Sequence, residues 1–137
     1  MKNENLVNAY VLPNLLYELM FLQDEYGIDV PDQDWTNPAT IDAVIRRFVL
    51  SRFESFSSGT KDVIRNTLQY LLVNEGPESE IWETIWQASS APIPTPDGER
   101  AFFLRCYKAL FGDVLPKAPL MSSFHVNHSM QVANRLN

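Results

Sequence analysis

Apolar residues recur along this chain at the spacing of α-helices, and no segment reads convincingly as a β-strand. The clearest helix begins at Asn37, a residue type that caps helices, with Pro38 at the first helical position. The apolar residues that follow share one helical face: Ile41, Val44, Ile45, Phe48, Val49, Phe53 and Phe56. This pattern predicts a core helix that begins at Pro38.

Further segments have the same helical spacing and end at residues that stop helices. The expected helices cover about 14–26, 61–74, 78–88 and 97–111, and Ser58 or Thr60 is expected to cap the second of them. Because Pro13 disfavours a helical conformation at Leu12, residues 1–12 are expected to form an N-terminal arm or a separate helical turn. Residues 122–137 show a weaker helical pattern, which we expect to fray at its end.

These segments predict an all-α fold, a compact bundle of five to six helices in a single domain of 137 residues. The apolar fraction of 45% indicates a packed core and argues against disorder. With Cys106 as the single cysteine, no disulfide can form within the chain, as is common in reducing compartments. No export signal or membrane span is recognised, so a cytoplasmic protein is expected.

Charge is more informative, because the net charge of −6 is concentrated in two acidic blocks. Residues 18–34 contain six carboxylates and no Lys or Arg, and the same is true of residues 75–99. Such blocks repel polyphosphate and attract basic protein surfaces. We therefore expect a basic protein partner and no nucleic-acid partner. The predicted contact residues are Asp24, Glu25, Asp29, Asp32, Asp34, Trp35, Glu75, Glu78, Glu80 and Glu83.

Two features of the first block have alternative interpretations. Trp35 either fixes the acidic loop onto the helix that follows or contacts the partner, because aromatic residues are enriched at interfaces. Asp29, Asp32 and Asp34 could supply oxygen ligands to calcium, but the EF-hand pattern fails because Pro31 intrudes and the central Gly and late Glu are missing.

Catalytic signatures are lacking, and we predict neither an enzyme nor a metal or other cofactor. The alternative is a metal-dependent enzyme that uses His125 and His128, which would lie on one side of a helix at their i, i+3 spacing. A zinc site needs three or four ligands, however, and the nearest acid in sequence is as distant as Asp113. Cys106 lies among aromatic residues and is expected to be a buried structural thiol.

In size, acidity and helical class, the whole chain resembles the immunity proteins of bacterial toxin–immunity systems, including those of contact-dependent growth inhibition. This resemblance implies a small cytosolic protein that binds a basic toxin domain, such as a nuclease, and blocks its active site. Carboxylates would then cover the phosphate-binding groove of the toxin. A structural or adaptor subunit is the other alternative, and the oligomeric state is not indicated by the sequence.

Overall fold

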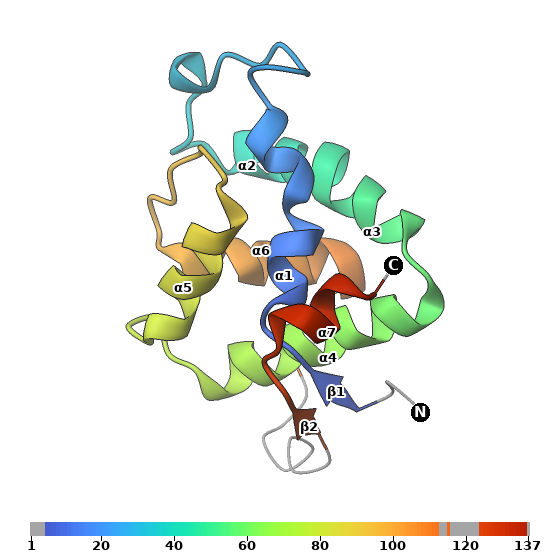
Figure 1. Ribbon diagram of the computed structural model, residues 1–137. Coiled ribbons are helices and arrows are strands. Elements are labelled where there is room, and N and C mark those ends of the chain that lie inside the picture. Colours follow the sequence, from blue (N-terminus) through green and yellow to red (C-terminus); the bar gives the residue numbers. More distant parts are fainter. Residues whose placement is uncertain (1–4, 113–114, 116–123, 137) are drawn as a thin grey trace.

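Helix α1 (Val11–Leu15) and the 3₁₀ helix η1 (Tyr17–Phe21) run through the middle of the protein, and the other helices surround them (Figure 1). The computed structural model describes residues 5–112, 115 and 124–136. The leucines at positions 12, 15, 16, 19 and 22 are each 0% exposed. In place of the single helix predicted at 14–26, the structure has these two short helices, which meet at Leu16 and end earlier than expected.

Pro13 lies inside α1, as its third residue, so the prediction that Leu12 would not be helical is wrong. The N–H groups of the first helical turn have no acceptor within the helix, so Pro13 removes no hydrogen bond there. The segment before it is not a free arm either. Leu6 is 5% exposed, Val7 and Asn8 are 0% exposed, and all three are buried against the rest of the fold.

The predicted core helix is confirmed as one continuous helical segment from Pro38 to Ser55. It consists of α2 (Pro38–Val44), the π-helical η3 (Ile45–Leu50) and α3 (Ser51–Ser55). Asn37 caps it as expected, because its side-chain oxygen accepts a hydrogen bond from the Ala39 N–H at 3.0 Å. The π-helical turn, which the sequence pattern did not indicate, places η3 against both η1 and α6.

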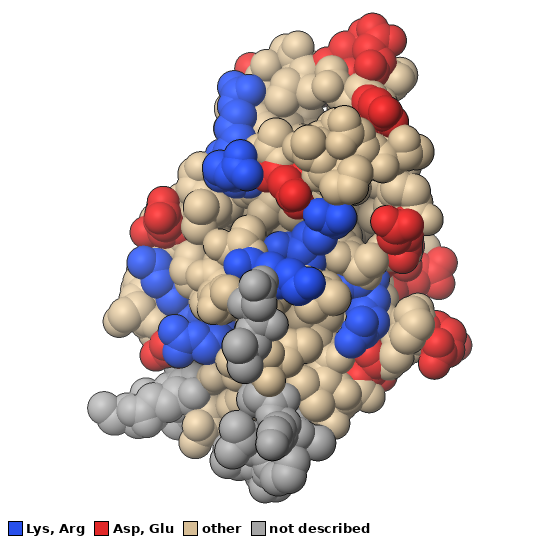
Figure 2. Space-filling view, turned by 180° about the vertical axis from the view of Figure 1, so that it is seen from behind, with Lys and Arg blue, Asp and Glu red and all other residues tan. Residues whose placement is uncertain are grey.

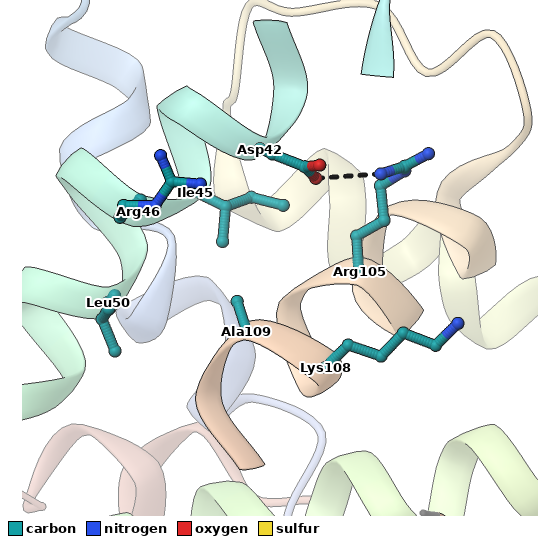
Figure 3. Close-up of a pocket in the computed structure, with 7 residues that line it drawn as sticks. All are labelled: Asp42, Ile45, Arg46, Leu50, Arg105, Lys108 and Ala109. Carbon is teal, nitrogen blue, oxygen red and sulfur yellow. Dashed lines mark hydrogen bonds and ion pairs between the residues drawn. The ribbon is translucent and has the colours of Figure 1, made fainter. Parts of the chain in front are cut away.

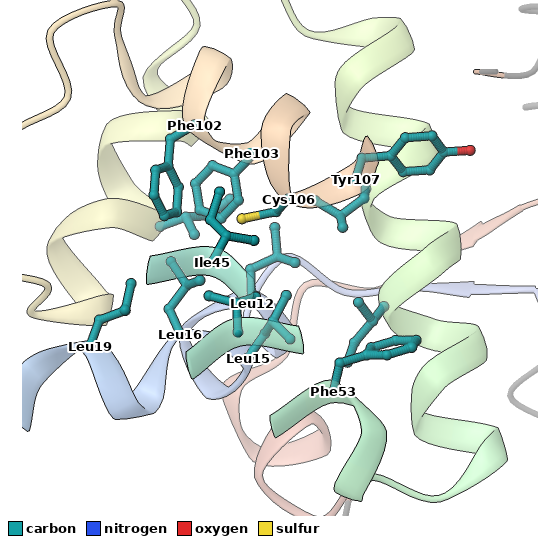
Figure 4. Packing of buried hydrophobic residues seen from close by; sticks show 14 of the residues in the cluster. Leu12, Leu15, Leu16, Leu19, Ile45, Phe53, Phe102, Phe103, Cys106 and Tyr107 are labelled. Carbon is teal, nitrogen blue, oxygen red and sulfur yellow. The ribbon is translucent and has the colours of Figure 1, made fainter. Parts of the chain in front are cut away.

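The remaining long helices are α4 (Ser58–Asn74), α5 (Glu80–Ser89) and α6 (Glu99–Phe111). The cap of α4 is Ser57, not Ser58 or Thr60, and its hydroxyl accepts a hydrogen bond from the Thr60 N–H at 3.3 Å. Figure 4 shows aromatic side chains of α6 next to leucines of α1 and η1 and to Ile45. Phe53 of α3 packs edge-on against Phe111 of α6, with the ring centres 5.2 Å apart. This core confirms the all-α fold.

The two ends of the described chain lie side by side (Figure 1). Strand β1 (Leu6–Val7) pairs in parallel with β2 (His125–Val126), and the short helix α7 (Met130–Asn134) follows. The helix predicted for 122–137 is therefore wrong at 124–129 and right at 130–134, and residues 122, 123 and 137 lie outside the described part. Asn8 joins these ends, because its Nδ2 donates to the Ser129 carbonyl oxygen at 2.8 Å and its Oδ1 accepts from the Ser129 N–H at 3.2 Å.

Candidate partner-binding site

The acidic loop of residues 22–37 is fixed to the core at two points. At its start, Gly27 adopts a left-handed conformation with φ of +67°, and the Ile28 N–H donates to the Leu22 carbonyl oxygen at 2.9 Å. Near its end, the Trp35 indole N–H donates to the Val30 carbonyl oxygen at 2.7 Å. A short 3₁₀ helix, η2 (Val30–Asp32), lies between these points. The loop therefore has a defined shape.

Trp35 is 7% exposed, and Val30, whose carbonyl it binds, is 8% exposed. A side chain buried to this extent holds the loop from inside and presents little surface to a partner. The inclusion of Trp35 among the partner contacts is corrected accordingly, and the alternative interpretation, that it fixes the loop, agrees with its position.

The loop and the helix that follows it enclose an open hollow of about 690 Å³. Its apolar side is formed by Ile28 of the loop, Val44 of α2 and Phe48 of η3. Its polar side carries Asp29, Asp32 and Gln33 from the loop and Arg47 from η3, with Gly27, Ala39, Thr40 and Ala43 completing the lining. Two of the predicted contact acids thus lie beside an apolar surface.

Asp29 and Asp32 are close enough to affect each other's protonation. The single turn of η2 separates them, and the Asp32 N–H donates to the Asp29 carbonyl oxygen at 3.1 Å. A hydrogen bond between the two carboxyl groups, with smaller effects from desolvation and from the charge of Asp32, raises the pKa of Asp29. The ionised form of Asp29 is therefore disfavoured relative to that of an isolated aspartate.

The other acids of the first block have different surroundings. Asp24 and Glu25 are exposed, and they do not line the hollow. Asp34 is exposed, and its Oδ1 accepts hydrogen bonds from the backbone N–H and the side-chain hydroxyl of Thr36, at 3.1 and 2.6 Å. Asp34 therefore shapes the turn that leads into α2.

The second block lies around the start of α5. Glu78, Glu80 and Glu83 are exposed, and the last two lie in the first turn of α5, where the helix dipole stabilises negative charge. Glu75 is half-buried and accepts a hydrogen bond from the Ser79 hydroxyl at 2.7 Å. None of these four residues lines the hollow, so the structure does not bring the two blocks together there.

Many acids nevertheless lie at one end and along one flank of the molecule. Figure 2 shows Asp and Glu side chains at the end formed by the loop of residues 22–37 and along the flank formed by α5. Lys and Arg side chains gather across the middle and the opposite flank of the same view, with single acidic side chains among them. Acidic and basic surfaces are thus only partly separated on this face.

The predicted contact acids keep their charges free of ion pairs. Within the described residues there are two ion pairs, Arg52 Nη1 with Glu18 Oε2 at 3.5 Å and Arg105 Nη1 with Asp42 Oδ1 at 2.9 Å. Neither pair includes a predicted contact residue. The carboxylates of the predicted contact residues are therefore available to a basic molecule.

The two histidines do not form the helical pair that their spacing suggested. His125 lies in β2, and His128 follows it, with its Nδ1 accepting a hydrogen bond from the Ala9 N–H at 2.8 Å. In residues 5–112, 115 and 124–136, no three His, Cys, Asp or Glu side chains are grouped so as to hold a metal ion. Cys106 is 0% exposed, as predicted, and burial raises the pKa of its thiol.

Sequence reasoning missed the residues that the core helix contributes to the hollow. Arg47 and Phe48 come from η3, and the Arg47 guanidinium carbon lies 4.8 Å from the Phe48 ring centre and 5.9 Å from that of Tyr26. A cation over an aromatic ring gains roughly 0.5–1 kcal/mol at an exposed site. The available signal was the pair of arginines at 46 and 47, which the helical spacing places outside the apolar face of the predicted helix.

Comparison with protein-family models, with curated proteins and with solved structures finds no match to this chain. Function must therefore be inferred from the site itself. In the same described residues, each helix is too short or too polar to cross a membrane.

Proposed function

We propose that this protein binds a basic protein partner and that the hollow beside the acidic loop is the docking site. The observation that carries the proposal is the crowding of Asp29 and Asp32 in one hollow beside the half-buried side chain of Ile28. A Lys or Arg of the partner would place its charged group by the two carboxylates and its apolar stem against Ile28.

The raised pKa of Asp29 supports a cationic occupant in particular. The main cause of this raised pKa is the hydrogen bond between the two carboxyl groups, which requires a proton, and a positive charge beside them would favour the ionised form instead. Arg47 also lines the hollow, and its positive charge would favour an occupant whose own cation lies beside the aspartates and away from Arg47. The unpaired acids around the loop and along α5 would speed association with a basic surface, because opposite charges steer the encounter.

The more specific form of the proposal is an immunity protein that blocks a toxin domain in the cytoplasm. The active site of a nuclease must attract phosphate, and a surface of free carboxylates is complementary to such a groove. The small size of the chain, its net charge of −6 and its helical fold are consistent with this role. No residue of the chain is assigned a catalytic role under this proposal.

The decisive experiment replaces the charges of the hollow without changing its shape. The Asp29→Asn/Asp32→Asn variant and the wild type would be used to capture partners from native cell extract, and the captured protein would then be purified for titration calorimetry. We expect a basic partner whose dissociation constant increases at least about tenfold in the variant, since charge-assisted hydrogen bonds contribute about 1.5–3 kcal/mol.

The matched control is Glu54→Gln/Asp62→Asn, which removes two carboxylates from α3 and α4, away from the hollow. It should bind the partner nearly as tightly as the wild type. An acidic partner, or equal affinities for the hollow variant and the wild type, would overturn the proposal. Light scattering and metal analysis of the purified protein test the alternatives of a self-associating subunit and of an enzyme that uses His125 and His128.

A further inference from the structure

A second hollow, with the opposite charge, lies between η3 and α6. It has a volume of about 370 Å³. Figure 3 shows the side chains that line it, which come from the helical segment 38–55 and from α6: Asp42, Ile45, Arg46, Leu50, Arg105, Lys108 and Ala109. We call it the basic groove. The adjacent arginines of the π-helical turn thus line different hollows, since Arg46 belongs to the basic groove and Arg47 to the hollow beside the acidic loop.

The charges of the basic groove are only partly neutralised within the protein. Arg105 donates from Nη1 to Oδ1 of Asp42 at 2.9 Å, and the two side chains are 33% and 46% exposed. Arg46 and Lys108 form no ion pair with any described residue. Three cations against one carboxylate leave a formal charge of +2 on a protein whose net charge is −6.

The groove also has an apolar part. Leu50, which is half-buried, and Ala109, which is exposed, supply its apolar surface, while Ile45 is 1% exposed and belongs to the core beneath. The ion pair between Asp42 and Arg105 joins the two helices and restrains the guanidinium at one side of the groove (Figure 3). A ligand would therefore find a partly ordered cation, two free cations and an apolar surface.

We propose that the basic groove binds a phosphate monoester carried on a small apolar group. A phosphate monoester has a charge of about −1.5 to −2 near pH 7, which balances the formal +2 of the groove. Arginine guanidinium groups match the geometry of phosphate oxygens and can bind them with two parallel hydrogen bonds. Leu50 and Ala109 would contact the organic part, and about 370 Å³ lies at the lower end of the volumes of small-molecule sites.

This inference is independent of the proposed partner site, because the residues that line the two hollows do not overlap. A carboxylate is the competing oxyanion, but its single charge would leave one positive charge of the groove unbalanced. Phenyl phosphate is therefore the probe, with benzoate as the monoanionic comparison and inorganic phosphate as the comparison without an apolar group.

The experiment titrates each probe into isotopically labelled protein and follows the backbone amide resonances of residues 45–50 and 105–109. We expect saturable shifts at these amides with phenyl phosphate and a dissociation constant on the order of 1 mM, the range expected for so small a ligand. Inorganic phosphate and benzoate should each bind at least about threefold more weakly, because each lacks one of the two interactions.

The Arg46→Ala/Lys108→Ala variant should weaken phenyl phosphate binding by about tenfold or more. The matched control is Arg65→Ala/Arg135→Ala, which removes the same charge from residues that do not line the groove and should retain the affinity. A melting curve of each variant confirms that it is folded. Shifts that stay linear and small, shifts that map elsewhere, or equal weakening in both variants would overturn the proposal.

Discussion

His128 connects protonation to the attachment of the chain end that contains β2 and α7. Its Nδ1 accepts the Ala9 N–H at 2.8 Å, and a protonated ring could not accept there. Desolvation lowers the pKa of His128, although the negative charge of Glu75 acts in the opposite direction. The unfolded chain, with its pKa near the ordinary value of 6.5, therefore takes up the proton more readily than the folded protein.

The free energy of unfolding should accordingly contain a contribution from His128 that is complete above about pH 6.5 and is lost as the pH falls through the lower pKa of the folded state. We expect its loss to cost less than about 1 kcal/mol, because the residue is exposed. Urea denaturation at several pH values between about 7 and 5 measures it. In His128→Asn the amide oxygen can accept the same N–H without titrating, so this dependence should largely disappear. It should persist in His125→Gln, and an unchanged profile in His128→Asn would contradict the assignment.

At the scale of secondary-structure elements, the sequence pattern located the long helices because each buries one apolar face and ends at a recognisable signal. Asn37 marks the start of one helix, as predicted, and Gly112 marks the end of another. The break at Leu16 has no comparable signal, since leucines on both sides of it are equally buried and continue the apolar stripe. The strand pair was also missed, because a two-residue strand is too short for periodicity, and its hydrogen bonds join residues 5–7 to residues 125–127.

Helix α4 is completed at its C-terminus by a side chain from α6. Arg100 donates from Nη2 to the Leu72 carbonyl oxygen at 2.5 Å and from Nε to the Glu75 carbonyl oxygen at 3.1 Å. The last carbonyl groups of a helix receive no hydrogen bond from N–H groups of the same helix. The helix dipole also favours a cation at this end. Arg100 thus links two helices through hydrogen bonds to the backbone.

Replacing Arg100 by Ala should lower the free energy of unfolding by about 2 kcal/mol, because two charge-assisted hydrogen bonds are lost and carbonyl groups are left without their donors. Arg100→Lys should recover only part of this loss, since an ammonium group cannot reproduce both guanidinium contacts. Arg135→Ala is the control, because Arg135 is exposed, and its loss should change stability by less than about 0.5 kcal/mol. Chemical denaturation compares the three variants, and equal stability of Arg100→Ala and Arg135→Ala would refute this capping role.

At the scale of the whole molecule, the sequence indicated which carboxylates are exposed but not what they face. Asp29 and Asp32 were predicted as surface acids, and both are exposed. That they share a hollow with Phe48 depends on how the loop folds back on η3, and that contact is fixed by Gly27 and by the buried Trp35. The basic groove was missed for the same reason, since its cations come from two helices distant in the sequence.

The excess of unpaired acids also has a consequence for stability. The net charge is −6, and the two ion pairs of the described residues involve only Glu18 and Asp42 among the acids. Unpaired like charges repel one another more strongly in the compact protein than in the extended chain. Salt screens this repulsion, since the Debye length falls from about 20 Å at low salt to below about 8 Å above 0.15 M.

Raising sodium chloride from about 20 mM to about 300 mM should therefore raise the melting temperature by about 3–5 °C, equivalent to about 1 kcal/mol. The two ion pairs act in the opposite direction, but exposed pairs contribute at most about 1 kcal/mol each and often much less. In Asp24→Asn/Glu25→Gln, which removes two exposed charges of the acidic loop, the melting temperature at low salt should exceed that of the wild type. The difference should shrink at high salt, because the removed repulsion is then already screened. Calorimetric scans of both proteins across this range measure the effect, and a wild-type melting temperature that falls with salt would show that attraction outweighs repulsion in the folded protein.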